Sequence, residues 1–352
     1  MTKYSFYDDY SEGAHIDILR PLPRAARDQQ KAYGDDEFSE EARKAIRSLI
    51  GADEARIYFT PSGTGANLLS VASHLRPHEA VIAAESGHIV GEEGGAIEAT
   101  GHQILTEPPG VDGKLTPGMI YFAFDRSWQS DFQPKPKMVF IANATESGTV
   151  YTKSELKAIA DICLSLKLFL LLDGARLGVA LTSSHNDLSL KDIYDLTDIF
   201  WIGGTTNGAM FGEAVVIKHP SFGVDFPYHM NQQGALLAKG RFLGIQFRAL
   251  FQDDLFFRIA RDANSAAAEL SSSLVKMGLE LWVRTESNRV FPIVPPALAE
   301  ELQKHFDFCV WKHLSDESLV IRLVTSWQTR QYEVQRFCKI VQKWTKKSSC
   351  EL

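Results

Sequence analysis

Short hydrophobic runs alternate with stretches of helical apolar spacing between about residue 56 and residue 218. Strands that helices cover on both faces are hydrophobic throughout, so this rhythm is typical of a mostly parallel sheet. The predicted strands are residues 56–60, 80–84, 138–142, 168–173, 198–202 and 214–218. We therefore expect an α/β fold with its large domain built on such a sheet.

The C-terminal part has a different pattern, since residues 235–278 have helical spacing over a long stretch. Further strands are predicted at residues 289–293, 307–311 and 319–325, and a final helix follows them. This order predicts a smaller α+β domain. We place residues 1–245 in an N-terminal arm and large domain, and residues 246–352 in the small domain.

Composition and charge narrow the class of protein. The 352 residues are 45% hydrophobic and carry a formal net charge of −7, with charges mixed along the chain. We expect neither nucleic acid nor a membrane as a partner, because the chain has no long basic run and no apolar run of roughly 20 residues. Cysteines form no C-x-x-C pair, so we predict no metal site, no disulfide framework and a cytoplasmic location. They are Cys163, Cys309, Cys338 and Cys350.

The first motif with chemical content is Thr60-Pro-Ser-Gly-Thr-Gly-Ala-Asn67, which follows a predicted strand and opens a helix. Free backbone N–H groups, the helix dipole and the hydroxyls of Ser62 and Thr64 suit an anion such as phosphate. A glycine turn with an ordinary serine cap has the same pattern, and that interpretation stays open. The segment is neither a Walker loop nor G-x-G-x-x-G, which weakens a nucleotide-binding interpretation.

A second motif, Leu170-Leu-Leu-Asp-Gly-Ala-Arg176, places an acid at the end of the strongest predicted strand. Ligands in parallel sheets bind beyond the carboxyl ends of the strands. Asp173 can hold a protonated pyridine nitrogen there, because the opposite charges stabilise each other, and Arg176 can bond a phenolate or carboxylate. Alternatively, Asp173 caps the next turn and Arg176 pairs with a surface acid.

The next predicted strand leads into Gly203-Gly-Thr-Thr-Asn-Gly208. This segment resembles G-G-T-K-N-G of the low-specificity threonine aldolases and, more broadly, of the β-eliminating lyases of pyridoxal phosphate fold type I. The resemblance implies a mostly parallel, seven-stranded sheet, pyridoxal 5′-phosphate as cofactor, and an amino acid substrate. L-Threonine or L-allo-threonine would be cleaved to glycine and acetaldehyde. The family lysine binds the cofactor covalently, and Thr206 occupies its position here.

Further segments match the family in chain order. His88, in Glu85-Ser-Gly-His88, corresponds to a histidine that stacks on the pyridoxal ring, and Glu92 lies one helical turn beyond it. Residues 143–151 resemble a loop that packs beside the cofactor. The segment Lys239-Gly-Arg-Phe-Leu243 resembles one that reaches a phosphate, often from a neighbouring subunit, so Arg241 implies a homodimer or homotetramer. In isolation these segments also suit a structural histidine, a glycine hairpin and a solvated helix face.

The resemblance assigns roles to individual positions. Catalytic roles fall to His88, Asp173 and the lysine-replacing Thr206. Cofactor binding falls to Ser62, Gly63, Thr64, His88, Asp173, Arg176, Thr205 and Arg241. Substrate binding falls to Ser11, Tyr33, Arg176 and Arg322, where Ser11 ends Asp9-Tyr-Ser11, Tyr33 opens Tyr33-Gly-Asp-Asp36, and Arg322 matches the arginine that grips the substrate carboxylate.

Two departures from the family pattern bear on turnover. The Thr206 hydroxyl cannot form an imine with the cofactor aldehyde, so binding is predicted to be non-covalent and reversible, and Lys239 is the candidate to replace the lost amine. Phe132 stands where many members have a histidine that helps deprotonate the substrate hydroxyl. Three interpretations stay open: a slow lyase of the threonine aldolase type, a non-catalytic relative or a form altered at position 206, and a nucleotide-binding enzyme.

Overall fold

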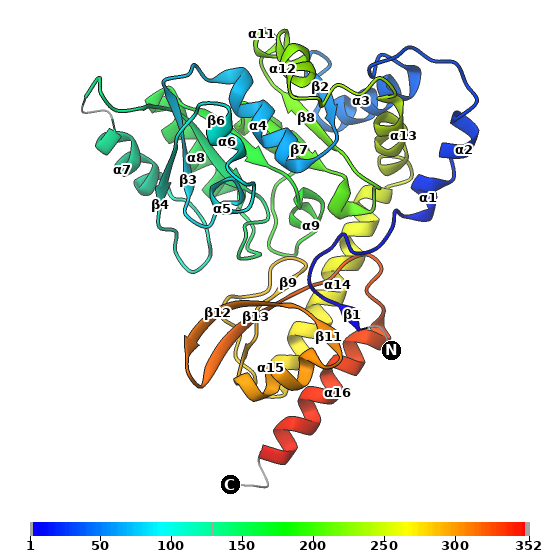
Figure 1. The fold of residues 1–352 in the computed structure, drawn as a ribbon, viewed down its shortest axis with the longest axis vertical. Coiled ribbons are helices and arrows are strands. Elements are labelled where there is room, and N and C mark those ends of the chain that lie inside the picture. Colours follow the sequence, from blue (N-terminus) through cyan, green and yellow to red (C-terminus); the bar gives the residue numbers. More distant parts are fainter. Residues whose placement is uncertain (1–2, 128–129, 349–352) are drawn as a thin grey trace.

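The computed structural model describes residues 3–127 and 130–348, and Cys350 lies outside these ranges. A large domain surrounds a twisted sheet, and a smaller domain lies to one side of it, with α14 (Leu255–Lys276) running between them (Figure 1). The predicted division at residue 245 falls within α13 (Arg241–Leu250) and remains a proposal.

A seven-stranded sheet forms the centre of the large domain, in the order β2-β8-β7-β6-β5-β3-β4. Its strands from β7 to β4 are parallel, while β8 runs antiparallel to both of its neighbours. The strands are β2 (Arg56–Thr60), β3 (Glu79–Ala84), β4 (Ile104–Glu107), β5 (Lys135–Ala142), β6 (Phe169–Asp173), β7 (Ile199–Gly203) and β8 (Glu213–Ile217). The predicted fold class is confirmed, although the short edge strand β4 was not predicted.

Helices cover both faces of this sheet, because successive strand residues point into two different cores. Leu170 and Leu172 of β6 belong to one core, and Leu171 belongs to the other. The first core includes α3 (Glu37–Ile50), α7 (Pro117–Ser127), α8 (Lys153–Leu166), α10 (Leu190–Leu196) and α13, and the second includes α4 (Gly63–His74), α5 (His88–Gly91), α6 (Ala96–Ala99) and α12 (Phe226–Gln232). Short helices α1 (Ile16–Leu19), α2 (Leu22–Ala25), α9 (Leu177–Leu181) and α11 (Pro220–Gly223) complete the domain.

The small domain combines an antiparallel sheet with helices, which agrees with the predicted α+β pattern. Its strands β9 (Arg289–Val290), β10 (Ile293–Val294) and β12 (Cys309–Ser315) all pair with β13 (Ser318–Val324). Helices α14, α15 (Pro296–Gln303) and α16 (Gln331–Ser348) pack against them. The N-terminal β1 (Tyr4–Ser5) pairs with β11 (Phe306–Asp307), so the first residues of the chain join this domain.

The ends of β6 and β7 approach closely, and this contact positions the site. A Cβ atom on Gly174 would lie 1.7 Å from the carbonyl oxygen of Trp201, so only glycine permits the chain to pass there. The residue before it, Asp173, ends β6, and the 3₁₀ turn η1 (Thr205–Asn207) follows β7. The lysine-replacing Thr206 is thereby brought to the same edge of the sheet as Asp173.

Candidate functional site

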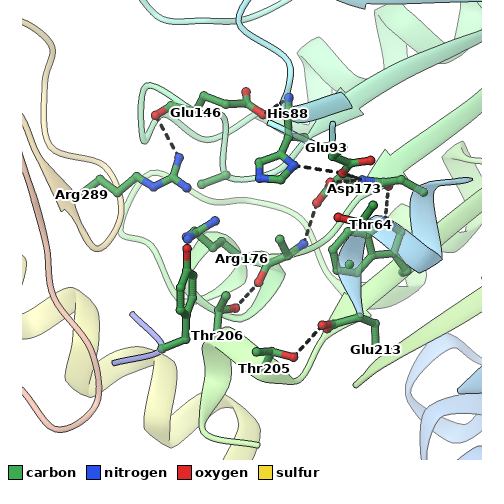
Figure 2. Close-up of a pocket in the computed structure, with 17 residues that line it drawn as sticks. Thr64, His88, Glu93, Glu146, Asp173, Arg176, Thr205, Thr206, Glu213 and Arg289 are labelled. Carbon is green, nitrogen blue, oxygen red and sulfur yellow. Dashed lines mark hydrogen bonds and ion pairs between the residues drawn. The ribbon is translucent and has the colours of Figure 1, made fainter. Parts of the chain in front are cut away.

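A cavity of about 290 Å³ lies beyond the carboxyl ends of β5, β6 and β7 (Figure 2). Segments far apart in the sequence form it, as expected for a ligand site in a parallel sheet. Most of the predicted site residues line it, namely Gly63, Thr64, His88, Asp173, Arg176, Thr205 and Thr206. The other lining residues are Tyr10, Asn67, Glu93, Ala142, Ala144, Glu146, Ala175, Trp201, Glu213 and Arg289.

The N-terminus of α4 supplies one wall of the cavity. Ser62 is its N-cap and accepts a hydrogen bond from the Gly65 N–H at 3.1 Å. The cap therefore serves the third residue of the helix and leaves Gly63 and Thr64, which line the cavity, at the positive end of the helix dipole. The serine cap is confirmed, and anion binding by this helix end stays a prediction with which the cap is compatible.

Asp173 is a buried acid with both carboxylate oxygens held. One oxygen accepts from Asn67 Nδ2 at 2.9 Å and the other from the Ala175 N–H at 2.8 Å. Asn67 is oriented in turn by the Trp201 indole, which donates to its Oδ1 at 2.8 Å. Burial raises the pKa of Asp173 to about 6, although these hydrogen bonds oppose the rise. A cation in the cavity would relieve that cost.

His88 forms an ion pair at the mouth of the cavity. Its Nδ1 lies 3.0 Å from Glu93 Oε1, and the Glu93 side chain is fully buried while that of His88 is 44% exposed. The hydrogen bond to Glu93 raises the pKa of His88. Sequence spacing pointed to Glu92 as its neighbour, but α5 ends at Gly91, so the chain leaves the helix and Glu92 is exposed while Glu93 turns inward.

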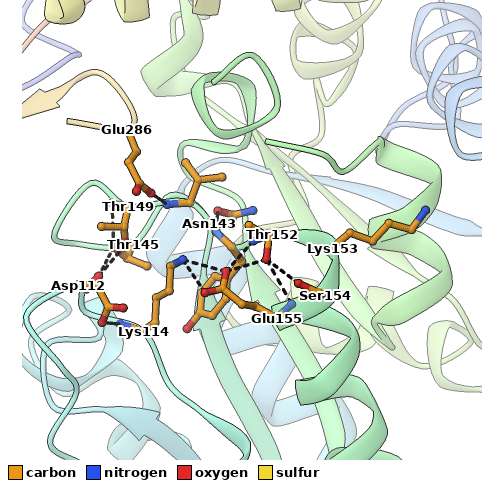
Figure 3. Close-up of polar contacts among 12 residues, drawn as sticks. Asp112, Lys114, Asn143, Thr145, Thr149, Thr152, Lys153, Ser154, Glu155 and Glu286 are labelled. Atoms are coloured by element: carbon orange, nitrogen blue, oxygen red, sulfur yellow. Dashed lines mark hydrogen bonds and ion pairs between the residues drawn. The ribbon is translucent and has the colours of Figure 1, made fainter. Parts of the chain in front are cut away.

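The loop of residues 143–151 contributes Ala144 and Glu146 to the cavity lining. Polar contacts outside the cavity hold this loop in place (Figure 3). The hydroxyls of Thr145 and Thr149 lie 2.8 Å apart, and both donate to the Asp112 carbonyl. The Val150 N–H donates to the Glu286 carboxylate at 2.9 Å. These contacts fix Glu146, whose carboxylate accepts from the His88 N–H at 3.0 Å.

Thr206 and Thr205 lie at the lower edge of the cavity in Figure 2. The Thr206 hydroxyl donates to the Ala175 carbonyl. The Thr205 hydroxyl donates to Glu213 at 2.7 Å, and burial raises the pKa of Glu213 to about 8. Among the described residues no lysine lines this cavity, and Lys239 is exposed elsewhere.

Two arginines line the cavity with different charge environments. Arg176 pairs with the buried Asp9 through two hydrogen bonds of 2.9 Å each, so its partner is an internal acid rather than a surface one. Arg289, only 6% exposed, donates to the backbone carbonyls of Thr145 and Glu146, and its Nε has no hydrogen-bond partner among the described residues. Burial, with repulsion from other arginines, lowers the pKa of Arg289 to about 9.

Six lining residues with titratable or amide side chains were given no site role from the sequence: Tyr10, Asn67, Glu93, Glu146, Glu213 and Arg289. Asn67 stands within the quoted glycine-rich motif, and Glu213 follows the G-G-T-T-N-G segment, so their positions offered a weak signal. Arg289 opens a two-residue strand in a segment without any motif, and no pattern points to it.

The remaining predicted residues lie outside this cavity within one chain. Ser11 bonds Asp8, Tyr33 lines a separate hollow beside Gly240, and Arg241 donates to the Asp28 carbonyl. Arg322 lies near the Tyr7 carbonyl at 3.4 Å and over the Trp311 ring. Phe132 is 98% exposed.

Residues 3–127 and 130–348 were also searched for metal sites, disulfides and membrane-spanning helices. No group of three or more His, Cys, Asp or Glu side chains in these ranges is arranged to hold a metal ion. The cysteines they contain, Cys163, Cys309 and Cys338, are free. No described helix is both long and apolar enough to cross a bilayer.

The chemistry of the lining suits pyridoxal 5′-phosphate in part. The end of α4 at Gly63 and Thr64 suits its phosphate, the buried Asp173 suits a protonated ring nitrogen, and the His88 ring suits a stacking contact. The residues fit the charged groups and the ring of the cofactor. They offer no amine for a covalent bond to its aldehyde.

Known proteins are similar along most of the chain. The model of the beta-eliminating lyase family matches residues 20–295. Low-specificity L-threonine aldolases from Pseudomonas aeruginosa and a Pseudomonas species are 36% and 34% identical, covering 81% and 93% of this chain and 82% and 93% of the relatives. The solved Leishmania major threonine aldolase has a TM-score of 0.95 at 42% identity, covering 97% of this chain and 99% of that one. This chain therefore belongs to the beta-eliminating lyase family.

Proposed function

We propose that the chain is a threonine aldolase-type lyase that binds pyridoxal 5′-phosphate without a covalent bond and cleaves β-hydroxy-α-amino acids. L-Threonine and L-allo-threonine are the expected substrates, and glycine and acetaldehyde the products. One observation carries the proposal: the helix end at Gly63, the buried carboxyl of Asp173 and the ring of His88 come from three segments and line one cavity. The two Pseudomonas relatives and the Leishmania structure bear the name of this activity.

Each end of the cofactor has a partner in the cavity. Gly63 and Thr64 would hold the phosphate at the α4 N-terminus, and the Thr205 hydroxyl lies at the same cavity. Asp173 would pair with the protonated ring nitrogen, and this charge keeps the ring electron-poor. When bound, pyridoxal phosphate accepts electrons from the bond that breaks at the amino acid Cα.

The chain's own residues must bind the amino acid and move its protons. We assign the substrate carboxylate to Arg289, which lines the cavity, and to the predicted Arg322, which lies just outside it on β13, the strand that pairs with β9 of Arg289. Each of the two has a buried Nε without a partner among the described residues. His88, oriented by Glu93, is the titratable ring that lines the cavity and can take the proton of the substrate hydroxyl. It replaces the family histidine whose position Phe132 occupies.

Thr206 sets the rate in this proposal. Without a lysine in the lining, the chain would hold the cofactor by non-covalent contacts alone, so the cofactor could dissociate. Turnover is therefore expected to be slow and to require added cofactor. Lys239 does not substitute for the lysine, because it is exposed and does not line the cavity.

We also propose that the protein is a homodimer or homotetramer and that it is cytoplasmic. Tyr33 and Arg241 lie away from the cavity of their own chain, beside a second hollow and the Asp28 carbonyl. In a family oligomer they would complete the pocket of a neighbouring subunit. A monomeric sedimentation profile would contradict this part of the proposal.

The release of glycine and acetaldehyde from L-threonine tests the activity. The wild-type protein is expected to release both slowly, with a rate that saturates as pyridoxal phosphate is added, and Thr206→Lys is expected to be faster. Asp173→Ala provides the background, because it removes the partner of the ring nitrogen. If neither the wild type nor Thr206→Lys exceeds this background, the proposed activity is wrong and a non-catalytic relative is the better interpretation.

A further inference from the structure

The position that the family lysine occupies presents a hydrogen-bond acceptor in this chain. The proton of the Thr206 hydroxyl is committed to the Ala175 carbonyl. A hydroxyl that donates in this way still has lone pairs to offer, and Thr206 lines the cavity. A ligand group that meets Thr206 is therefore bound best if it donates a hydrogen bond.

The backbone of Ala175 fixes which end of the ring Thr206 would meet. Its N–H donates to Asp173, and its carbonyl accepts from Thr206, so Ala175 separates the acid from the hydroxyl. Ala175 itself lines the cavity. A pyridine ring with its nitrogen at Asp173 would therefore direct the opposite carbon, which bears the 4′ substituent, toward Thr206.

Acidic and basic side chains both line the cavity. The carboxyl groups of Glu93, Glu146, Asp173 and Glu213 line it together with His88, Arg176 and Arg289, and burial raises the pKa of Glu213 to about 8, so Glu213 is mostly protonated at neutral pH. The fully buried Glu93 side chain also has one oxygen, Oε2, with no hydrogen-bond partner among the described residues. The positive charge of Arg176 is matched by Asp9, so this arginine does not neutralise these acids.

We propose that the cavity selects the amine form of the cofactor, pyridoxamine 5′-phosphate, over the aldehyde form. The inference rests on the proposed binding of a phosphorylated pyridine. The 4′-ammonium group would donate to the Thr206 hydroxyl oxygen, whose own proton is directed at the Ala175 carbonyl. The 4′-aldehyde offers only an acceptor, which faces the lone pairs of Thr206, and the threonine can donate to it only by giving up the Ala175 carbonyl.

Three ligands with the same ring and phosphate test the inference. They are pyridoxamine 5′-phosphate, pyridoxal 5′-phosphate and 4′-deoxypyridoxine 5′-phosphate, which carries a methyl group in place of the amine or aldehyde. Dissociation constants would be measured by titration calorimetry with the full-length protein. Because a hydrogen bond from a charged donor is strong, we expect the amine form to bind at least about tenfold tighter than the methyl analogue. The aldehyde form should bind no tighter than the methyl analogue.

Variants at position 206 separate this inference from the proposed function. Thr206→Val keeps the side-chain shape and should lose the preference for the amine while binding the methyl analogue as before, and Thr206→Ser should keep the preference. Equal affinities in the wild type, or a preference that survives in Thr206→Val, would overturn the inference while leaving the proposed cofactor site standing. If none of the three ligands binds the wild type, the proposed function fails and the inference fails with it.

Discussion

Replacement of Asp173 by asparagine should stabilise the ligand-free protein at neutral pH while destroying its cofactor site. Burial raises the pKa of Asp173 from 3.8 to about 6, which corresponds to about 3 kcal/mol. The folded pKa lies above the unfolded value, so the favourable contribution is complete below pH 3.8 and is lost as pH rises through 6. Near pH 7.5 the wild type therefore bears the full cost of a buried charge.

Asparagine removes this ionisation but introduces a mismatch. Its oxygen can still accept from the Ala175 N–H, while its amide nitrogen faces the Nδ2 of Asn67, a donor against a donor. Loss of that hydrogen bond should cost about 1–2 kcal/mol. The net effect at pH 7.5 is a gain of about 1–2 kcal/mol. At pH 4.5 the raised pKa of Asp173 lowers the stability of the wild type by only about 1 kcal/mol. The variant should therefore show no gain or a small loss of stability at this pH.

Urea denaturation at the two pH values, followed by tryptophan fluorescence, measures this difference. Asp161→Asn is a suitable control, because that carboxylate is 60% exposed. Asp173→Asn should also no longer bind a phosphorylated pyridine. A stability change of equal size at both pH values, or a loss at pH 7.5, would show that ionisation of the buried Asp173 does not destabilise the folded protein.

Three further variants probe the cavity. Glu213→Gln should be more stable than the wild type at pH 9 but not at pH 4.5, and urea denaturation at the two pH values measures this. The reason is that burial raises the pKa of Glu213 to about 8, so the wild type loses stability as pH rises through that value. Arg176→Met leaves the buried Asp9 without its charged partner, although Asn288 still donates to it, and should cost about 3–5 kcal/mol in unfolding free energy, part of which Asp9→Asn should restore. Arg289→Gln should weaken amino acid binding by about 2–5 kcal/mol in competition calorimetry, and unchanged binding would remove Arg289 from the site.

The fold could be predicted because its signals are local. The apolar run that ends at Asp173 predicts a buried strand, and the glycine turn before α4 predicts a helix start, each from a few neighbouring residues. The edge strand β4 was missed because it is only four residues long and mostly half-buried, so it lacks the continuous apolar run of the central strands.

Individual site residues could be predicted only where they stand in a recognisable sequence motif. Asn67 belongs to such a motif, yet its role as a bridge between Glu93 and Asp173 arises from the packing of three segments. Helical spacing selected Glu92 rather than Glu93, because the sequence gives no sign that α5 ends after one turn. Arg289 reaches the cavity from the small domain, and its placement depends on how the two domains pack.

Titration of the purified protein with pyridoxal phosphate, followed by borohydride reduction and intact mass spectrometry, distinguishes non-covalent from covalent cofactor binding. We expect a saturable change in cofactor absorbance for the wild type without a permanent mass increase, and a single pyridoxyl group on Thr206→Lys. An absence of saturable binding in the wild type would show that the cavity is not a cofactor site, and a pyridoxyl group fixed to Lys239 of the unaltered chain would show that another amine replaces the family lysine.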